Sequence, residues 1–129
     1  MTYLTLLLAA KIMVTLATVI VPFLLFKTET LDRLAGFGRP NEAFYRLYGM
    51  AILALVVAYS GGLLQTLSGE YPAQIVAMGL ASNVGAVCLM IWTGYARVQK
   101  ALAAFFGLIG IGFLWAALRP ISAMLPVWS

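Results

Sequence analysis

Residues 101–118 read ALAAFFGLIGIGFLWAAL, a run of eighteen residues without a charged side chain. A helix needs about 20 mostly apolar residues to cross the hydrocarbon core of a bilayer. A surface helix of a soluble protein would instead alternate an apolar face with a polar one. The stretch therefore predicts a helix that spans a membrane, and it sets the frame for the rest of the chain.

Three further apolar runs of similar length precede this one. We expect spans at roughly 3–26, 44–67, 73–95 and 101–118. None of the runs shows the period-two alternation of a membrane β-strand. The sequence predicts an all-α, integral membrane four-helix bundle that forms one domain over residues 1–129, with antiparallel neighbours joined by short turns. The first run is too long for the core of a signal peptide, so we expect it to be retained as a span.

The composition excludes several classes of protein. Hydrophobic residues make up 64% of the 129 residues and charged residues 9%, and the mean hydropathy is +1.01. A typical soluble domain is about 45–50% apolar and about 25% charged, and a small chain buries only about two-thirds of the surface it could expose. We therefore exclude a soluble globular domain, a disordered chain and a nucleic-acid binder, and we expect membrane lipids as partners.

The basic residues predict an orientation. The chain has eight Lys or Arg and four Asp or Glu. Six of the eight lie in or beside the first and third connections: Lys27, Arg33, Arg39, Arg46, Arg97 and Lys100. Arg119 lies on the other side and Lys11 within the first span. The positive-inside rule then predicts that both termini are non-cytoplasmic, in a bacterial inner membrane.

The chain lacks the residues of most catalytic and metal sites. It has no histidine and a single cysteine, Cys88, and no acidic residue falls inside an expected span. This composition argues against a zinc or haem-iron site and against a Ser-His-Asp arrangement. We predict no metal ligands and no catalytic residues.

Two polar residues lie inside spans. Lys11 is unusual because a charge at the centre of a membrane helix costs roughly 2.5–3.5 kcal/mol on insertion scales. We expect it either to snorkel to the interface or pair with Glu70, or to serve a ligand or proton path along a face shared with Thr15 and Thr18. Asn83 needs a partner in lipid, which is either a neighbouring helix or a ligand.

Small residues predict where helices approach closely. They recur at a spacing of four on the second and third spans, and glycines thin one side of the fourth. The residues are Ala54, Ala58 and Gly62, then Ala77, Ala81 and Gly85, then Gly107, Gly110 and Gly112. We expect the first two stripes to pack on each other and the third to face a helix or a flat ligand.

The start of the second span carries a family resemblance. Residues 44–49 read FYRLYG and follow a segment with Leu31, Leu34, Gly36 and Pro40. This pattern resembles the small four-span membrane proteins of the DoxX-like and DUF4345-like group. The resemblance implies a four-helix membrane bundle, a link to quinone or redox complexes in some members, and structural roles for Arg46, Tyr48 and Gly49. From its position, Arg46 is also able to pair with Glu42 one turn earlier.

The functional expectation follows from these features. We expect a non-catalytic subunit or accessory protein of a larger membrane complex, of respiratory or photosynthetic type. It would pack lipid, quinone or pigment between helices and associate with other membrane subunits or with itself. The alternatives are a small homo-oligomeric transporter or channel, with Lys11 and Glu70 along its path, and a small membrane enzyme acting on a lipid or isoprenoid.

Overall fold

A computed structural model describes residues 1–35 and 42–127, and this part of the chain is helical, without a strand. Four helices are long and apolar enough to cross a membrane: Tyr3–Leu25, Glu42–Leu67, Ala73–Thr93 and Lys100–Leu118. The prediction of an all-α chain with four membrane-length helices is confirmed, which supports an integral membrane protein. Arg39, Gly36 and Pro40 lie outside the described residues.

The first long helix contains a break in its regular pattern. It consists of α1 (Tyr3–Thr15), a π-helical turn η1 (Leu16–Ile20) and α2 (Val21–Leu25). Pro22 follows the wide turn, and its ring would clash with the carbonyl of Thr18 in a regular helix. The π turn accommodates the proline, and the Val21 N–H donates to the Leu16 carbonyl.

The π turn also changes which residues share a face. Lys11 and Thr15 are both buried, but Thr18 is exposed and its hydroxyl donates to the Val14 carbonyl at 2.7 Å. The expectation that Thr18 continues the buried face was wrong, because the wider turn rotates the residues that follow Thr15.

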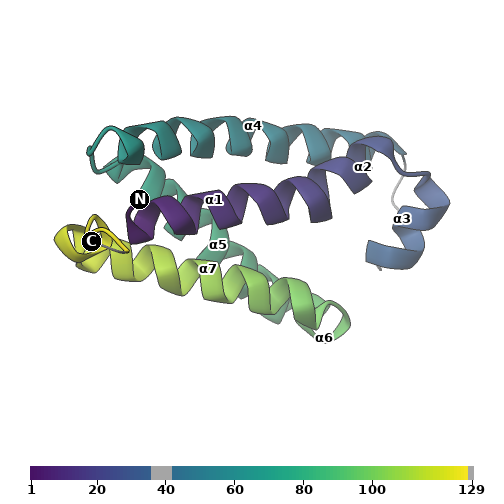
Figure 1. Ribbon diagram of the computed structural model, residues 1–129. Helices are drawn as coiled ribbons and strands as arrows, with labels where there is room; N and C mark the ends of the chain where they lie inside the picture. Colours follow the sequence, from purple (N-terminus) through teal and green to yellow (C-terminus); the bar gives the residue numbers. More distant parts are fainter. Residues whose placement is uncertain (36–41, 128–129) are drawn as a thin grey trace.

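The four long helices form two pairs, and the first long helix, which belongs to one pair, also contacts the other pair. In Figure 1, α1 lies between α4 (Glu42–Leu67) and α7 (Lys100–Leu118), while α5 (Ala73–Thr93) crosses behind. The closest pairing joins α5 to α7, and α1 packs against α4, whereas α4 and α5 touch little. The N-terminus, the α4–α5 turn and α8 (Pro120–Ala123) lie at one end of the bundle.

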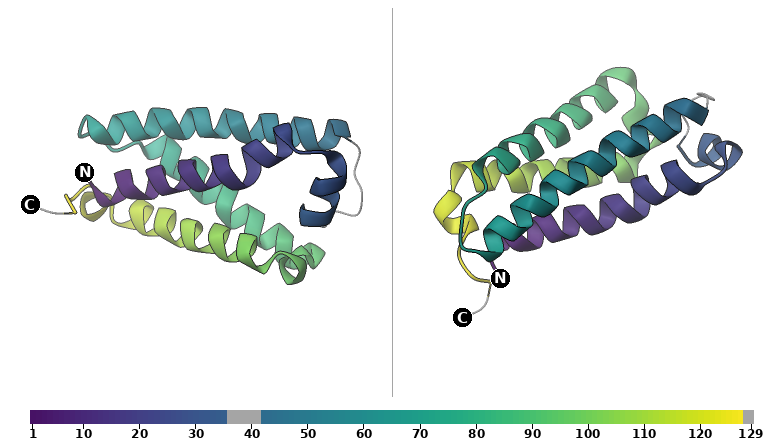
Figure 2. Two further views of the ribbon diagram at one scale, coloured as in Figure 1. Left: turned by 45° about the vertical axis from the view of Figure 1, so that its right-hand side comes forward. Right: turned by 90° about the horizontal axis from the view of Figure 1, so that it is seen from above.

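Two short helices lie at the opposite end, namely α3 (Thr28–Ala35) and α6 (Tyr95–Val98), as Figure 2 shows. Leu31 of α3 is buried against the bundle. The Tyr45 hydroxyl of α4 donates to Asp32 Oδ1 at 2.6 Å, and Gln99 Nε2 donates to the Leu34 carbonyl at 2.5 Å. These contacts join α3 to α4 and to the start of α7.

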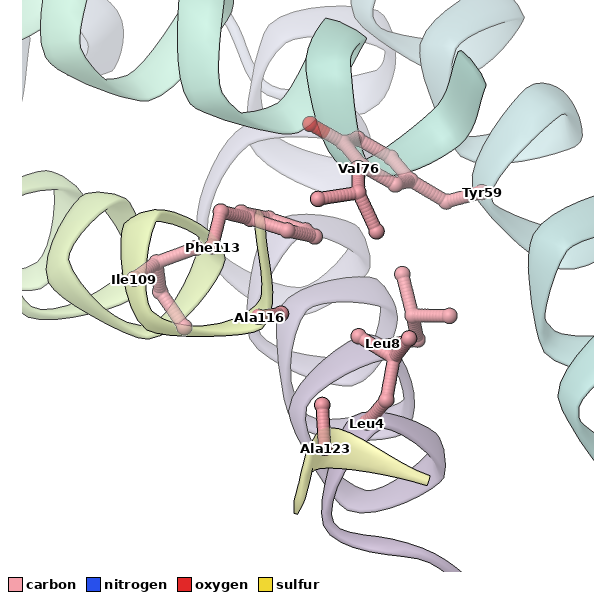
Figure 3. Packing of buried hydrophobic residues seen from close by; sticks show 8 residues of the cluster. All are labelled: Leu4, Leu8, Tyr59, Val76, Ile109, Phe113, Ala116 and Ala123. Carbon is pink, nitrogen blue, oxygen red and sulfur yellow. The ribbon is translucent and has the colours of Figure 1, made fainter. Parts of the chain in front are cut away.

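The main core lies toward the end that carries the N-terminus. Tyr59 of α4, Val76 of α5 and Phe113 of α7 converge with the leucines of α1 (Figure 3). The buried members of this core are Leu4, Leu8, Tyr59, Val76, Ile109, Phe113, Ala116 and Ala123. Side chains from all four long helices thus interlock around the first half of α1.

The two alanine-rich stripes do not pack on each other. Ala54 of α4 and Ala77 and Ala81 of α5 are exposed. The expectation that these faces meet was wrong, because α4 pairs with α1 and α5 pairs with α7. Ala58 and Gly85 are only half-buried.

Glycines make the close approaches instead, at positions where a large side chain fills the space. A Cβ atom at Gly62 would lie 2.7 Å from Ile75 Cγ2, so this glycine does allow α4 and α5 to meet near their turn. On α7, a Cβ at Gly112 would lie 2.8 Å from Leu7 Cδ1, and one at Gly110 would lie 3.3 Å from Val84 Cγ2. A Cβ at Gly107 would meet open space.

Candidate functional site

Lys11 is buried within the bundle. It lies eight residues beyond the start of the helix, about 12 Å along its axis. Only 5% of the residue is exposed, and Nζ donates to Asn83 Oδ1 of α5 at 2.9 Å. Nζ also lies 4.8 Å from the ring centroid of Phe106, 5.2 Å from that of Phe105 and 5.9 Å from that of Tyr59. The side chain therefore points into the protein and does not snorkel.

The predicted pair between Lys11 and Glu70 does not form. Glu70 is exposed in the turn after α4, and in the described residues 1–35 and 42–127 no ion pair joins it to Lys11. From its depth in α1, Lys11 reaches across to α5 instead of toward the end of the bundle. All four acidic residues lie in connections or at the first residue of α4.

Asn83 is fully buried, and its side-chain amide is held by several neighbours. Nδ2 donates to the Gly79 carbonyl at 2.6 Å and lies 3.3 Å from Ser82 Oγ and 3.4 Å from the Tyr59 hydroxyl. These contacts engage the nitrogen end of the amide, so the oxygen end faces Lys11. The Tyr59 and Ser82 hydroxyls are themselves 3.1 Å apart.

A cavity of about 90 Å³ lies beside this network, and Lys11, Thr15, Tyr59 and Asn83 are among its lining residues. Thr15 is 4% exposed, and its hydroxyl has no hydrogen-bond partner within the described part of the chain. The Lys11 ammonium has three N–H groups, and Asn83 accepts from one of them. The cavity is large enough for water-sized groups, and it presents donors that lack acceptors.

A larger, mostly apolar groove of about 370 Å³ adjoins this cavity. The two share the lining residues Val19, Tyr48 and Phe106. The groove continues between the first helix and α7 toward α3 and α6, where Leu31 and Tyr95 line it. Burial raises the pKa of the Tyr95 phenol to about 12, with a smaller electrostatic contribution from Tyr48, so this phenol is neutral at physiological pH.

The π turn places residues in both spaces. Thr15, immediately before it, lines the small cavity, and Thr18 and Pro22 line the groove. Val19, inside the turn, lines both. Single π turns inside α-helices occur frequently at functional sites, and this one borders both the cavity and the groove.

The contacts of Arg46 connect helices and do not involve the cavity. Its guanidinium donates to the carbonyls of Phe23 at 2.7 Å and Phe26 at 2.8 Å, and it lies 3.3 Å from Glu42 Oε1. The last carbonyls of a helix lack partners within it, so Arg46 closes the end of α2. Tyr48 is half-buried and stands away from Arg46, between the cavity and the groove.

The structure thus brings together Lys11, Asn83 and Tyr48 around one space, and it leaves Glu70 and Arg46 outside it. Sequence reasoning missed Tyr59, Phe105 and Phe106, because an aromatic residue on an apolar helix has no distinguishing signal. In the described residues, no group of three His, Cys, Asp or Glu that would hold a metal is found.

Searches against protein-family models, curated proteins and solved structures found no match to this chain. The resemblance to the DoxX-like and DUF4345-like group therefore stays a prediction.

Proposed function

We propose that this chain is a non-catalytic membrane subunit or accessory protein that holds a lipid-like molecule, such as a lipid, quinone or pigment, between its helices. The single observation that carries the proposal is the buried Lys11 ammonium, which has spare donors beside an apolar groove. A charged group inside a membrane helix bundle marks a functional site by default. The groove and the cavity together offer an apolar region and a polar end, as ligand sites commonly do.

The orientation in the membrane is part of the proposal. We infer antiparallel neighbouring spans, both termini on the non-cytoplasmic side of a bacterial inner membrane, and the α3 and α6 end in the cytoplasm. Two contacts support the antiparallel order. Thr5 near the start of α1 donates to Thr66 near the end of α4 at 2.9 Å, while Arg46 near the start of α4 bonds to carbonyls at the end of α2. A reporter that fluoresces only in the cytoplasm should stay dark when fused to the C-terminus.

The binding proposal is tested by extracting the native protein from its membrane together with surrounding lipid. We expect mass spectrometry to find one amphipathic molecule enriched above its share of the bulk membrane, and we expect Lys11→Met to lose this enrichment. Lys100→Met is the matched control, because Lys100 is exposed at the start of α7. Bulk lipids in bulk proportions for all three proteins would contradict the proposal.

The subunit part of the proposal has its own readout. After mild solubilisation we expect other membrane subunits to co-purify with the chain in fixed proportion. Recovery only as a lone monomer or as a homo-oligomer would count against an accessory role, while leaving the ligand result intact.

A further inference from the structure

We infer that the molecule held in this site is a single-chain amphiphile with an ionised carboxylate head, of the long-chain fatty acid type. The inference rests on the proposed function and names the chemistry of its ligand. The carboxylate would lie in the cavity beside Lys11 and Thr15, and the acyl chain would lie in the groove that leads toward α3 and α6.

The charge of the site favours an anion. Lys11 is 5% exposed, its hydrogen-bond acceptor is a neutral amide, and three aromatic rings surround the ammonium. A buried charge is costly unless a partner compensates it. Each acid of the chain lies in a connection or at the first residue of α4, and the ion pair of the described residues joins Arg46 to Glu42. A ligand carboxylate would supply the missing negative charge.

The hydrogen-bonding pattern agrees with this charge. Thr15 lies four residues after Lys11, so both side chains project from one face of α1. Thr15 is 4% exposed and lines the cavity, and its hydroxyl has no hydrogen-bond partner among the described residues. An ionised carboxylate only accepts hydrogen bonds, and its two oxygens can take one from each residue.

The shape of the site favours one chain and a small head. The cavity holds about 90 Å³, whereas the groove that adjoins it holds about 370 Å³ and is lined mainly by apolar side chains. A glycerophospholipid would bring two chains and a bulky phosphate group to this cavity. A single acyl chain ending in a carboxylate matches a small space that Lys11 and Thr15 line, continued by one apolar groove.

The test compares head groups on one chain length. The full-length protein, delipidated in a neutral detergent, is offered equimolar palmitate, hexadecanol, methyl palmitate and a ubiquinone, and the bound species are read by native mass spectrometry. We expect palmitate to exceed each neutral compound by at least about tenfold, since one charge-assisted contact of 1.4 kcal/mol corresponds to tenfold. Equal binding of palmitate and the neutral compounds would overturn the carboxylate.

Variants separate charge from folding. Lys11→Met should reduce the binding of palmitate to the level of hexadecanol binding. Lys11→Gln, which keeps a hydrogen-bond donor for Asn83, should do the same. Thr15→Val should weaken palmitate severalfold, whereas Lys100→Met and Thr93→Val, both exposed and outside the cavity and groove, should leave it unchanged. Retained palmitate preference in well-folded Lys11→Gln would overturn the inference.

The two proposals fail in different ways. Preferential binding of the ubiquinone or the alcohol would contradict the inference of a carboxylate head group but would agree with the proposed function. Absence of binding by every compound, together with absence of an enriched molecule in the native extract, would remove both.

Discussion

The two halves of the bundle differ in how completely their interiors are filled. Toward the N-terminal end of α1, Leu4, Leu8 and Phe113 have no exposed surface, and side chains press against glycines of neighbouring helices. Toward α3 and α6, the groove lies between the first helix and α7, and the cavity beside it lies mainly among the first helix, α4 and α5. A Cβ at Gly107 of α7 would meet open space. In the filled half the Val127 N–H also donates to the Met1 carbonyl at 3.0 Å, which joins the segment after α8 to the residues before α1.

This difference suggests that one half of the bundle stabilises the fold and that the other half forms the proposed binding site. Helices in lipid associate through close packing and interhelical hydrogen bonds, because the surrounding tails are as apolar as leucine. The filled half supplies that packing, whereas the open half presents the Thr15 hydroxyl, which lacks a partner among the described residues, and the apolar walls of the groove. Lys11 and Asn83 lie at the boundary, where the cavity meets the core residue Tyr59.

The largest predicted effect comes from filling the tight half further. Gly79→Ala would place a Cβ 2.5 Å from Phe113 Cε2, and Phe113 cannot move freely because it is fully buried and its ring stacks on that of Tyr59. We expect the free energy of unfolding to fall by about 3 kcal/mol. The measurement is reversible unfolding in mixed micelles, followed by circular dichroism.

The matched control lies in the open half. Gly107→Ala adds the same methyl group where nothing lies within 4 Å, and alanine favours a helix over glycine by about 1 kcal/mol. It should leave stability unchanged or raise it slightly. Equal losses for the two variants would mean that the halves do not differ in packing.

The four membrane-length helices were predictable from the sequence because hydropathy alone decides where they lie. The apolar runs that gave spans at 3–26, 44–67, 73–95 and 101–118 correspond to the four long helices within a few residues. Pairing was less predictable, since small residues such as Ala54 and Ala81 occur on lipid-facing surfaces as well as at contacts. What decides a contact is the partner that fills the space, as Phe113 does at Gly79.

The site was only partly predictable. A lone charge and a lone amide within apolar runs identified Lys11 and Asn83, but nothing in the sequence says that they touch across α1 and α5. The prediction that Glu70 pairs with Lys11 assumed that the lysine side chain extends toward the non-cytoplasmic surface, where Glu70 is the acidic residue. Lys11 instead points inward and bonds to Asn83, because its side chain is buried within the bundle. Pro22 is the residue of the sequence from which the π turn beside the cavity could have been expected.

The second prediction tests the pair at the boundary of the halves. Asn83→Leu leaves the buried ammonium without its acceptor, and we expect a loss of about 2 kcal/mol in stability. Lys11→Met removes the charge together with its desolvation cost and should lose less than about 1 kcal/mol. Unfolding in mixed micelles measures both.

The double variant decides whether the two residues act together. Because Lys11 and Asn83 share a 2.9 Å hydrogen bond, the combined loss should fall short of the sum of the single losses by more than about 0.5 kcal/mol. Additive losses would show that Asn83 stabilises the bundle through its contacts with Gly79 and Tyr59 alone.

The smallest predicted effect concerns the end of α2 in the open half. Arg46→Gln removes donors from the carbonyls of Phe23 and Phe26, which end the helix that walls the groove. We expect about 1 kcal/mol of lost stability, because two carbonyls near the end of α2 would lose their charged donor. Hydrogen exchange should quicken at the amide of Phe26, which bonds to the Pro22 carbonyl.

The contrast with Glu42→Gln isolates the carbonyl contacts from the ion pair. Glu42 is 69% exposed on its side chain and touches Arg46 at 3.3 Å, so this surface pair should contribute less than about 0.5 kcal/mol. If Glu42→Gln cost as much as Arg46→Gln, Arg46 would act as a surface charge. If only Arg46→Gln quickens exchange, the arginine anchors the first helix to α4 and so fixes one wall of the groove that we propose to hold the acyl chain.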